Sequence, residues 1–135
     1  MRNQLRITDT PITSIVIPDS GRVGVTATGH RLLLLDLNTG SVAQMEGRHS
    51  DVITTVAITA EGDLAVSGAE DGTVALWRIR NRSLAGIFSL DAPITSVAIS
   101  STRPRHIVAG DVGGAAHFFL VQDEDAESPS IVVTG

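Results

Sequence analysis

The side chains best suited to chemistry in this chain of 135 residues are its histidines and one acidic cluster. The histidines are His30, His49, His106 and His117, and the cluster consists of Asp123, Glu124, Asp125 and Glu127. No pair of histidines has the H-x-H or i, i+4 spacing that places two ligands on one element. The acidic run lacks the glycine and the alternating ligand positions of a calcium loop. We therefore expect structural or surface histidines, a solvated acidic loop and no bound metal.

Three glycines near the C-terminus could suggest a nucleotide-binding loop. Gly110, Gly113 and Gly114 do not have the G-x-G-x-x-G spacing, however. The residues that follow, 115–120, are predicted to form a strand, so no helix N-terminus is available to bind a phosphate. We expect a turn here.

Composition excludes several kinds of enzyme. The chain has no cysteine, and all ten of its basic residues are arginine. It therefore has no thiolate nucleophile, no thiolate metal site, and no lysine for a Schiff base or a P-loop. No G-x-S-x-G or H-E-x-x-H motif is present. We expect a protein that is not an enzyme, with no catalytic residue and no cofactor.

Charge and hydropathy limit the partners. The formal net charge is -5 and the isoelectric point is about 5.2, and no polybasic stripe is present for nucleic acid. Arg78, Arg80 and Arg82 alternate near a predicted strand end and are expected to form an exposed rim. The N-terminal residues lack the apolar core of a signal peptide, and the longest apolar runs are far below the ~18 residues of a membrane span. We expect a soluble, cytoplasmic protein with no nucleic-acid or membrane partner.

The elements that position these residues form an internal repeat. Three segments align without gaps: PITSIVI at 11–17, VITTVAI at 52–58 and PITSVAI at 93–99. They recur at intervals of 41 residues, which predicts three copies of one structural unit. Short apolar runs separated by Gly, Asp, Asn and Ser turns predict four strands in each copy.

The three copies are predicted at about 10–47, 49–89 and 91–135 of a single repeat segment, and residues 4–8 are predicted to be an extra outer strand. In the first copy, strands are expected at 12–17, 23–27, 32–37 and 41–45. In the second copy they are expected at 52–58 and 64–67, then in a run ending at Trp77, then at 84–89. In the third copy the first strand is expected within the repeated segment 93–99, and further strands are expected at 117–121 and 131–134.

The second copy resembles the WD repeat, the unit of one blade of a β-propeller. Its stretch SGAEDGTVALW, from Ser67 to Trp77, matches the Ser-Gly-Ser-x-Asp-x-Thr-Val-x-Leu-Trp pattern of that family, with Arg78 in place of the final Asp. Arg48-His49 stands where the family has Gly-His. The resemblance implies an all-β fold of four-stranded antiparallel blades. It also implies a structural hydrogen-bonded tetrad made of His49, Ser67, Asp71 and Trp77.

The other two copies depart from this pattern. In the first, Thr26 and Leu35 occupy the Ser and Trp positions and the turn is one residue shorter. In the third, Phe119 replaces Trp, Gly113 replaces Asp and no histidine opens the copy. The stretch 108–120 is similar to the atypical last blade of propellers at the C-termini of NACHT and NB-ARC signal-transduction NTPases.

Three blades are fewer than a closed propeller has, because complete rings have typically 4 to 8. Each predicted sheet is apolar on both faces, so an end blade would expose an apolar surface that soluble monomers rarely tolerate. We expect oligomerisation to complete the ring. A dimer with six blades is favoured, a trimer with nine is next, and a separate partner chain is third.

The resemblance implies a non-enzymatic interaction or scaffold module that binds a protein or peptide. Charged loop residues gain little for folding, so we expect partner contacts from the loops at the end that carries the tetrad. These residues are Asp9, His30, Arg48, Asp51, Glu70 and Asp91. The alternative is a C-terminal sensor fragment of a larger NACHT or NB-ARC-type signalling ATPase. A propeller enzyme with a metal in its channel is a third possibility, for which purified protein would contain metal.

Overall fold

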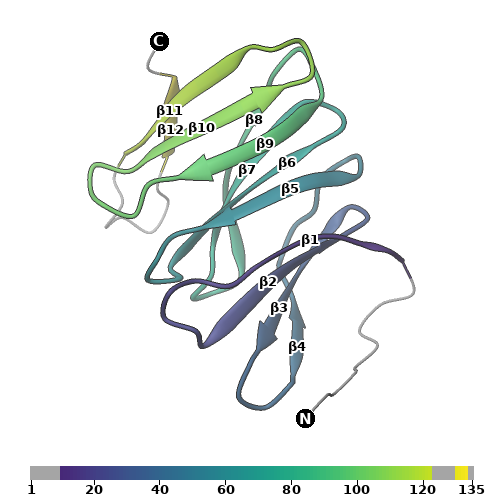
Figure 1. Ribbon diagram of the computed structural model, residues 1–135, viewed down its shortest axis with the longest axis vertical. Coiled ribbons are helices and arrows are strands. Elements are labelled where there is room, and N and C mark those ends of the chain that lie inside the picture. Colours follow the sequence, from purple (N-terminus) through teal and green to yellow (C-terminus); the bar gives the residue numbers. More distant parts are fainter. Residues whose placement is uncertain (1–9, 123–129, 134–135) are drawn as a thin grey trace.

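The computed structural model describes residues 10–122 and 130–133, which form three separate antiparallel sheets of four strands (Figure 1). The first sheet contains β1 (Ile12–Val16), β2 (Val23–Thr28), β3 (Arg31–Asp36) and β4 (Val42–Gln44). The second contains β5 (Ile53–Ile58), β6 (Leu64–Ala69), β7 (Thr73–Arg78) and β8 (Ser83–Ser89). The third contains β9 (Ile94–Ile99), β10 (His106–Asp111), β11 (Ala116–Gln122) and β12 (Ser130–Val133). The predicted all-β architecture of three four-stranded blades is confirmed.

Within each sheet the strands follow chain order, as in a meander. The sheets stand in a row, so that β1 contacts β5 and β5 contacts β9 (Figure 1). These three strands come from the segments that recur at intervals of 41 residues. The expected strand ends differ from the observed ones by one or two residues. The predicted strand at 4–8 lies outside the described residues.

The core consists of two apolar layers, each between successive sheets. The first layer joins the first and second sheets through buried residues that include Val25, Leu32, Ile53, Val56 and Trp77. The second joins the second and third sheets through residues that include Val66, Leu76, Ile94, Ile107 and Phe119. Alternate residues of a strand point to opposite faces, so the middle sheet supplies side chains to both layers. All six residues of β6 are buried as a result.

A threonine near the start of the first strand of a sheet, β1 or β5, links that sheet to the next one. Thr13 donates its hydroxyl hydrogen bond to the Ile53 carbonyl at 2.9 Å. Thr54, its repeat equivalent, donates to the Ile94 carbonyl at 2.5 Å. In both cases the acceptor is the first residue of the first strand of the next sheet, β5 or β9. The same polar contact therefore sets the register of both interfaces.

A buried arginine adds a second link between the second and third sheets. Arg105 stands in the β9–β10 loop, and its guanidinium donates to Asp63 Oδ2 at 2.6 Å and to Glu61 Oε2 at 2.9 Å. Burial alone would raise the pKa of Asp63, but hydrogen bonds from the Thr59 hydroxyl and from Arg105 hold it below its ordinary value. The third copy is one residue longer than the second in this loop, because Ile99 follows Ile58 by 41 residues whereas Ile107 follows Ala65 by 42.

A glycine in β6 provides the seat for an isoleucine of the third sheet. A Cβ added at Gly68 would lie 2.4 Å from Ile94 Cγ2 and 2.8 Å from Ile94 Cβ. Real Cβ atoms do not approach other carbons so closely, and the second and third sheets would have to separate to admit one. The close packing of these two sheets therefore depends on the missing side chain.

We expect Gly68→Ala to lower the free energy of unfolding by about 1–3 kcal/mol, because the new methyl group overpacks the interface. Gly24→Ala is the matched control, because a Cβ there meets its nearest atom, the Val16 carbonyl oxygen, at an ordinary 3.6 Å. That variant should be neutral or stabilised by up to about 1 kcal/mol. Urea unfolding followed by Trp77 fluorescence at one protein concentration measures both. Equal midpoints for the two variants would contradict the role given to Gly68.

Candidate functional site

A network of hydrogen bonds joins the loops at one end of the second sheet to its two middle strands, β6 and β7. His49 lies in the connection between β4 and β5, and Ser67 lies in β6. Asp71 stands in the β6–β7 turn, and Thr73 and Trp77 are in β7. His49, Ser67 and Trp77 are buried, with exposed fractions of at most 1%. The hydrogen-bond network therefore extends from the interior of the sheet to the β6–β7 turn at the surface.

The donors and acceptors of this network fit one arrangement of protons. Trp77 Nε1 donates to Ser67 Oγ at 2.8 Å, and Ser67 Oγ lies 2.6 Å from His49 Nε2. On the other side, Thr73 donates to Asp71 Oδ1 at 2.6 Å, and Thr73 Oγ1 lies 2.7 Å from His49 Nδ1. The carboxylate takes the Thr73 proton, so Thr73 accepts from Nδ1. Nε2 then accepts from Ser67, and every group is satisfied with a neutral imidazole carrying its proton on Nδ1.

Electrostatics favour the same neutral form. Burial lowers the pKa of His49, and the Asp71 carboxylate opposes this effect without reversing it. For Asp71, desolvation alone would raise the pKa, but the hydrogen bonds from the Thr73 hydroxyl and backbone N–H hold it below its ordinary value. A protonated His49 would instead donate from Nε2 to Ser67 and displace the Ser67 proton from its acceptor. The network therefore holds the loop with an uncharged histidine.

The four residues of the tetrad that the WD resemblance implies lie in one network. A fifth residue, Thr73, connects Asp71 to the other three. Asp71 joins the network through Thr73, which hydrogen-bonds to both the carboxylate and the imidazole. Sequence reasoning did not assign Thr73 a role. The available signal was its place two residues after Asp71, which lets one side chain cap the turn and contact His49.

The first and third copies do not reproduce this network. Thr26, at the Ser67 position, is buried, and its hydroxyl has no hydrogen-bond partner among the described residues. In the third sheet, Asp111 accepts from the Gly113 N–H at 2.8 Å and the Ala115 N–H at 3.1 Å, and pairs with His117 Nε2 at 2.9 Å. Sequence reasoning missed this pair, which caps the turn predicted at the three glycines. The hydrogen bond from His117, together with these N–H groups, lowers the pKa of Asp111.

A hollow of about 350 Å³ lies where the first and second sheets meet, beside the His49 network. It is lined by His30, Arg48, His49 and Ser50. Two backbone hydrogen bonds hold its walls together, from the His49 N–H to the His30 carbonyl and from the Ile53 N–H to the Gly29 carbonyl. His30, Arg48 and Ser50 are exposed and can offer hydrogen-bond donors to a bound group.

Of the residues predicted to contact a partner, some line the hollow and others do not. His30 and Arg48 share the hollow, although 18 residues separate them in the chain. Asp51 is half-buried, and its carboxylate accepts from the Val52 N–H at 2.7 Å. Glu70 and Asp91 are exposed but do not line the hollow. Asp9 lies outside the described residues.

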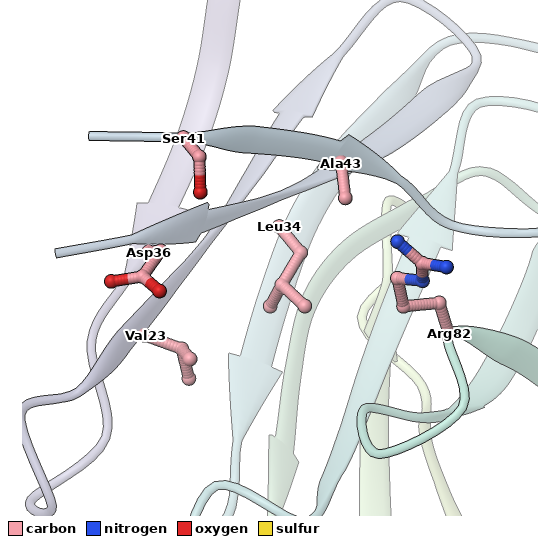
Figure 2. A pocket seen from close by; sticks show the side chains of 6 residues that line it. All are labelled: Val23, Leu34, Asp36, Ser41, Ala43 and Arg82. Carbon is pink, nitrogen blue, oxygen red and sulfur yellow. The ribbon is translucent and has the colours of Figure 1, made fainter. Parts of the chain in front are cut away.

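A second hollow of about 190 Å³ lies along the outer seam between the first two sheets. Figure 2 shows its lining, formed by Val23, Leu34, Asp36, Ser41, Ala43 and Arg82. Arg82 comes from the β7–β8 turn, and its carbonyl accepts from the Glu46 N–H at 2.6 Å. This volume is below the ~300–1,000 Å³ of small-molecule sites. We therefore interpret it as a packing seam rather than a ligand pocket.

Across residues 10–122 and 130–133, no three His, Cys, Asp or Glu side chains gather as a metal site would require. The same part of the chain contains no helix that is long and apolar enough to cross a membrane. The hollow lined by His30 and Arg48, with its hydrogen-bond donors, is the candidate binding site.

Comparisons with known proteins agree with the fold. The family model described as the TEP-1 C-terminal β-propeller matches residues 49–120. The chain is 28% identical over 129 residues to the Target of rapamycin complex subunit LST8 of Bos taurus, covering 88% of this chain and 38% of that protein. It is 26% identical over 90 residues to the small ribosomal subunit protein RACK1 of Schizosaccharomyces pombe, covering 67% of this chain and 28% of that protein. The chain thus spans well under half the length of these relatives.

A solved structure gives the same result for the backbone. The β-propeller domain of Cps50 (Swd1) from Myceliophteria thermophila matches with a TM-score of 0.79, covering 97% of this chain and 41% of that chain. At 17% identity, this likeness concerns the fold alone.

We expect the stability of the chain to fall as the pH drops from 7 to 5. The folded pKa of His49 is below the 6.5 of a free histidine, so in this window the unfolded state binds the proton first. Stability is complete above about pH 6.5 and is lost below it at up to about 1.4 kcal/mol per pH unit. Urea unfolding at each pH measures the slope. His49→Gln should flatten it, and the exposed-site control His30→Gln should retain it; equal slopes in both variants would contradict the assignment.

We expect opposite effects at the two equivalent hydroxyls. Ser67→Ala leaves Trp77 Nε1 and His49 Nε2 without partners and should cost about 2–4 kcal/mol. Thr26→Val removes a buried hydroxyl that has no partner among the described residues, and should be neutral or stabilising by about 1 kcal/mol. Thermal and urea unfolding measure both variants. A comparable loss at Thr26 would show that its hydroxyl is satisfied after all.

Proposed function

This chain belongs to the TEP-1 C-terminal β-propeller family and is built from WD repeats, and from this premise we propose that it is a non-enzymatic protein-interaction module. The observation that carries the proposal is the hollow at His30 and Arg48, which places donor side chains on a rigid frame. The donors are exposed, while the His49 imidazole behind them is buried and hydrogen-bonded through both of its nitrogens. The backbone that carries these donors is already fixed, so binding a partner does not require the loop itself to be ordered.

The names of the relatives support this function. LST8 is named as a subunit of the target of rapamycin complex, and RACK1 as a protein of the small ribosomal subunit. Both are components of assemblies. By this analogy, the present chain binds a protein or peptide through its loops.

The chemistry of the hollow indicates what it receives. Arg48 offers a guanidinium that can pair with a carboxylate in two parallel hydrogen bonds. His30 and Ser50 offer further polar groups at the same place. We propose that an acidic side chain of the partner enters here, with Asp9, Asp51, Glu70 and Asp91 contacting its surroundings. The negative residues then select against partners that are acidic throughout.

We expect the double variant His30→Ala, Arg48→Ala to lose partner capture while keeping its thermal midpoint within about 2 °C. Both side chains are exposed, so folding does not depend on them. The measurement is quantitative mass spectrometry of proteins retained from an extract of the native host by the immobilised chain.

The control is Arg80→Ala, which removes an exposed arginine from the opposite end of the second sheet. It should retain the same proteins as the parent chain. Unchanged capture by the double variant would remove the hollow from the binding site. Equal losses in the double variant and the control would indicate nonspecific charge effects instead.

A second candidate function starts from the resemblance of residues 108–120 to the last blade of propellers in NACHT and NB-ARC NTPases. We propose as the alternative that the chain is the C-terminal sensor fragment of a larger signalling ATPase of the NACHT or NB-ARC type. A P-loop motif encoded upstream in the same reading frame would favour this alternative. Its absence from that frame would favour the free-standing module.

A further inference from the structure

The row of sheets leaves an apolar surface uncovered at its first sheet. Ile12, Ile15 and Ile17 are exposed by 48%, 56% and 58%. Their repeat equivalents in the second sheet include Ile53 and Val56, which are exposed by 0% and 6% because the first sheet covers them. Within the described residues, no further sheet packs on these equivalent side chains of the first sheet.

The opposite surface is uncovered on the third sheet. Phe118 is 45% exposed, and Ala98 and Ala116 beside it are also exposed. The equivalent of Phe118 in the second sheet is Leu76, which is completely buried against the third sheet. Figure 1 shows the first and third sheets at opposite ends of the row. The first sheet therefore exposes the face that, in the second sheet, packs on the preceding sheet. The third sheet exposes the face that, in the second sheet, packs on the following sheet.

The threonine contact shows where the missing neighbour would dock. Thr13 and Thr54 each lie near one carbonyl of their own sheet and one of the next sheet. Thr95, the third member of this series, has its own-sheet carbonyl, Gly110, at 3.2 Å. The next-sheet acceptors of the first two are Ile53 and Ile94, and their repeat equivalent is Ile12.

The glycine seat leads to the same residue. Ile94 packs on Gly68, and the equivalent of Gly68 in the third sheet is Gly110. A Cβ added at Gly110 would approach only its own neighbours, Ser96 Oγ at 2.9 Å and Thr95 Oγ1 at 3.9 Å. Both neighbours belong to the third sheet itself, and no described residue of another sheet lies within 4 Å of this position. The isoleucine that matches Ile94 in the uncovered first sheet is again Ile12.

We propose that a second copy of this chain docks on the third sheet, with its Ile12 seated on Gly110 and its Ile12 carbonyl accepting from Thr95. The contact continues an interface that the chain already makes twice within itself. Because both halves are present in one chain, two copies can join at both ends and form a closed ring of six blades. Six lies within the usual 4 to 8, whereas three copies would give nine. This inference concerns self-assembly and stands whether or not the hollow at His30 binds a partner.

Light scattering after size-exclusion chromatography of the 135-residue chain tests the proposal. At micromolar concentration we expect twice the monomer mass of 14.1 kDa. Ile12→Asp places a carboxylate against the glycine seat and should raise the dissociation constant at least about 100-fold. Gly110→Val fills the seat from the other side and should have the same effect. Far-UV circular dichroism verifies that both variants remain folded.

The matched control is Ile87→Asp, because Ile87 is 51% exposed on the outer strand β8, away from both uncovered surfaces. It should remain dimeric. A monomeric parent chain would overturn the proposal, as would dimers that persist in both Ile12→Asp and Gly110→Val. A trimer would overturn the six-blade ring.

Cross-linking distinguishes this head-to-tail contact from two like surfaces pairing with each other. The chain has no cysteine, so single cysteines can be placed without background. Mixing Ile12→Cys with Thr95→Cys, which leaves Gly110 unchanged, and adding a short thiol-reactive cross-linker should give a covalent dimer that neither variant gives alone. Cross-linking of Ile12→Cys with itself would overturn the head-to-tail arrangement.

Discussion

The structure depends on the burial of the second sheet on both of its faces. Its inner positions carry apolar side chains on either side, and a sheet of this kind cannot be stable with one face in water. Val66 and Leu76 pack toward the third sheet, whereas Ala65 and Trp77 pack toward the first. Both neighbours are therefore required for the second sheet to fold. The end sheets repeat these positions on their outer surfaces, which are exposed at Ile12, Ile15 and Phe118.

Polar contacts give the apolar layers a defined register. Apolar packing alone tolerates small shifts between sheets, because it is not directional. The hydroxyls of Thr13 and Thr54 and the guanidinium of Arg105 each reach across to one fixed partner, and Gly68 accepts one isoleucine. These contacts hold successive sheets at one separation. The loops at their ends are positioned accordingly.

The three copies show how a turn can be fixed in different ways. The second uses a network from Trp77 to Asp71, with a neutral His49 at its centre. The third uses Asp111 and His117, which belong to the same hairpin. Polar groups in partly buried turns need partners, but the type of partner can vary. The second copy supports the polar hollow because its network lies directly behind it.

The sequence by itself determined the repeat, the four strands of each blade and the WD-repeat family, because period, turn residues and alternation are local properties of the chain. It also identified His49, Ser67, Asp71 and Trp77, whose spacing matches a known pattern. Only the tertiary structure decided that Thr73 connects two of them, that Arg105 is buried against Asp63, and that His30 lies beside Arg48. These contacts join residues from different turns or sheets. Their distances follow from how the sheets stack, which no local pattern encodes.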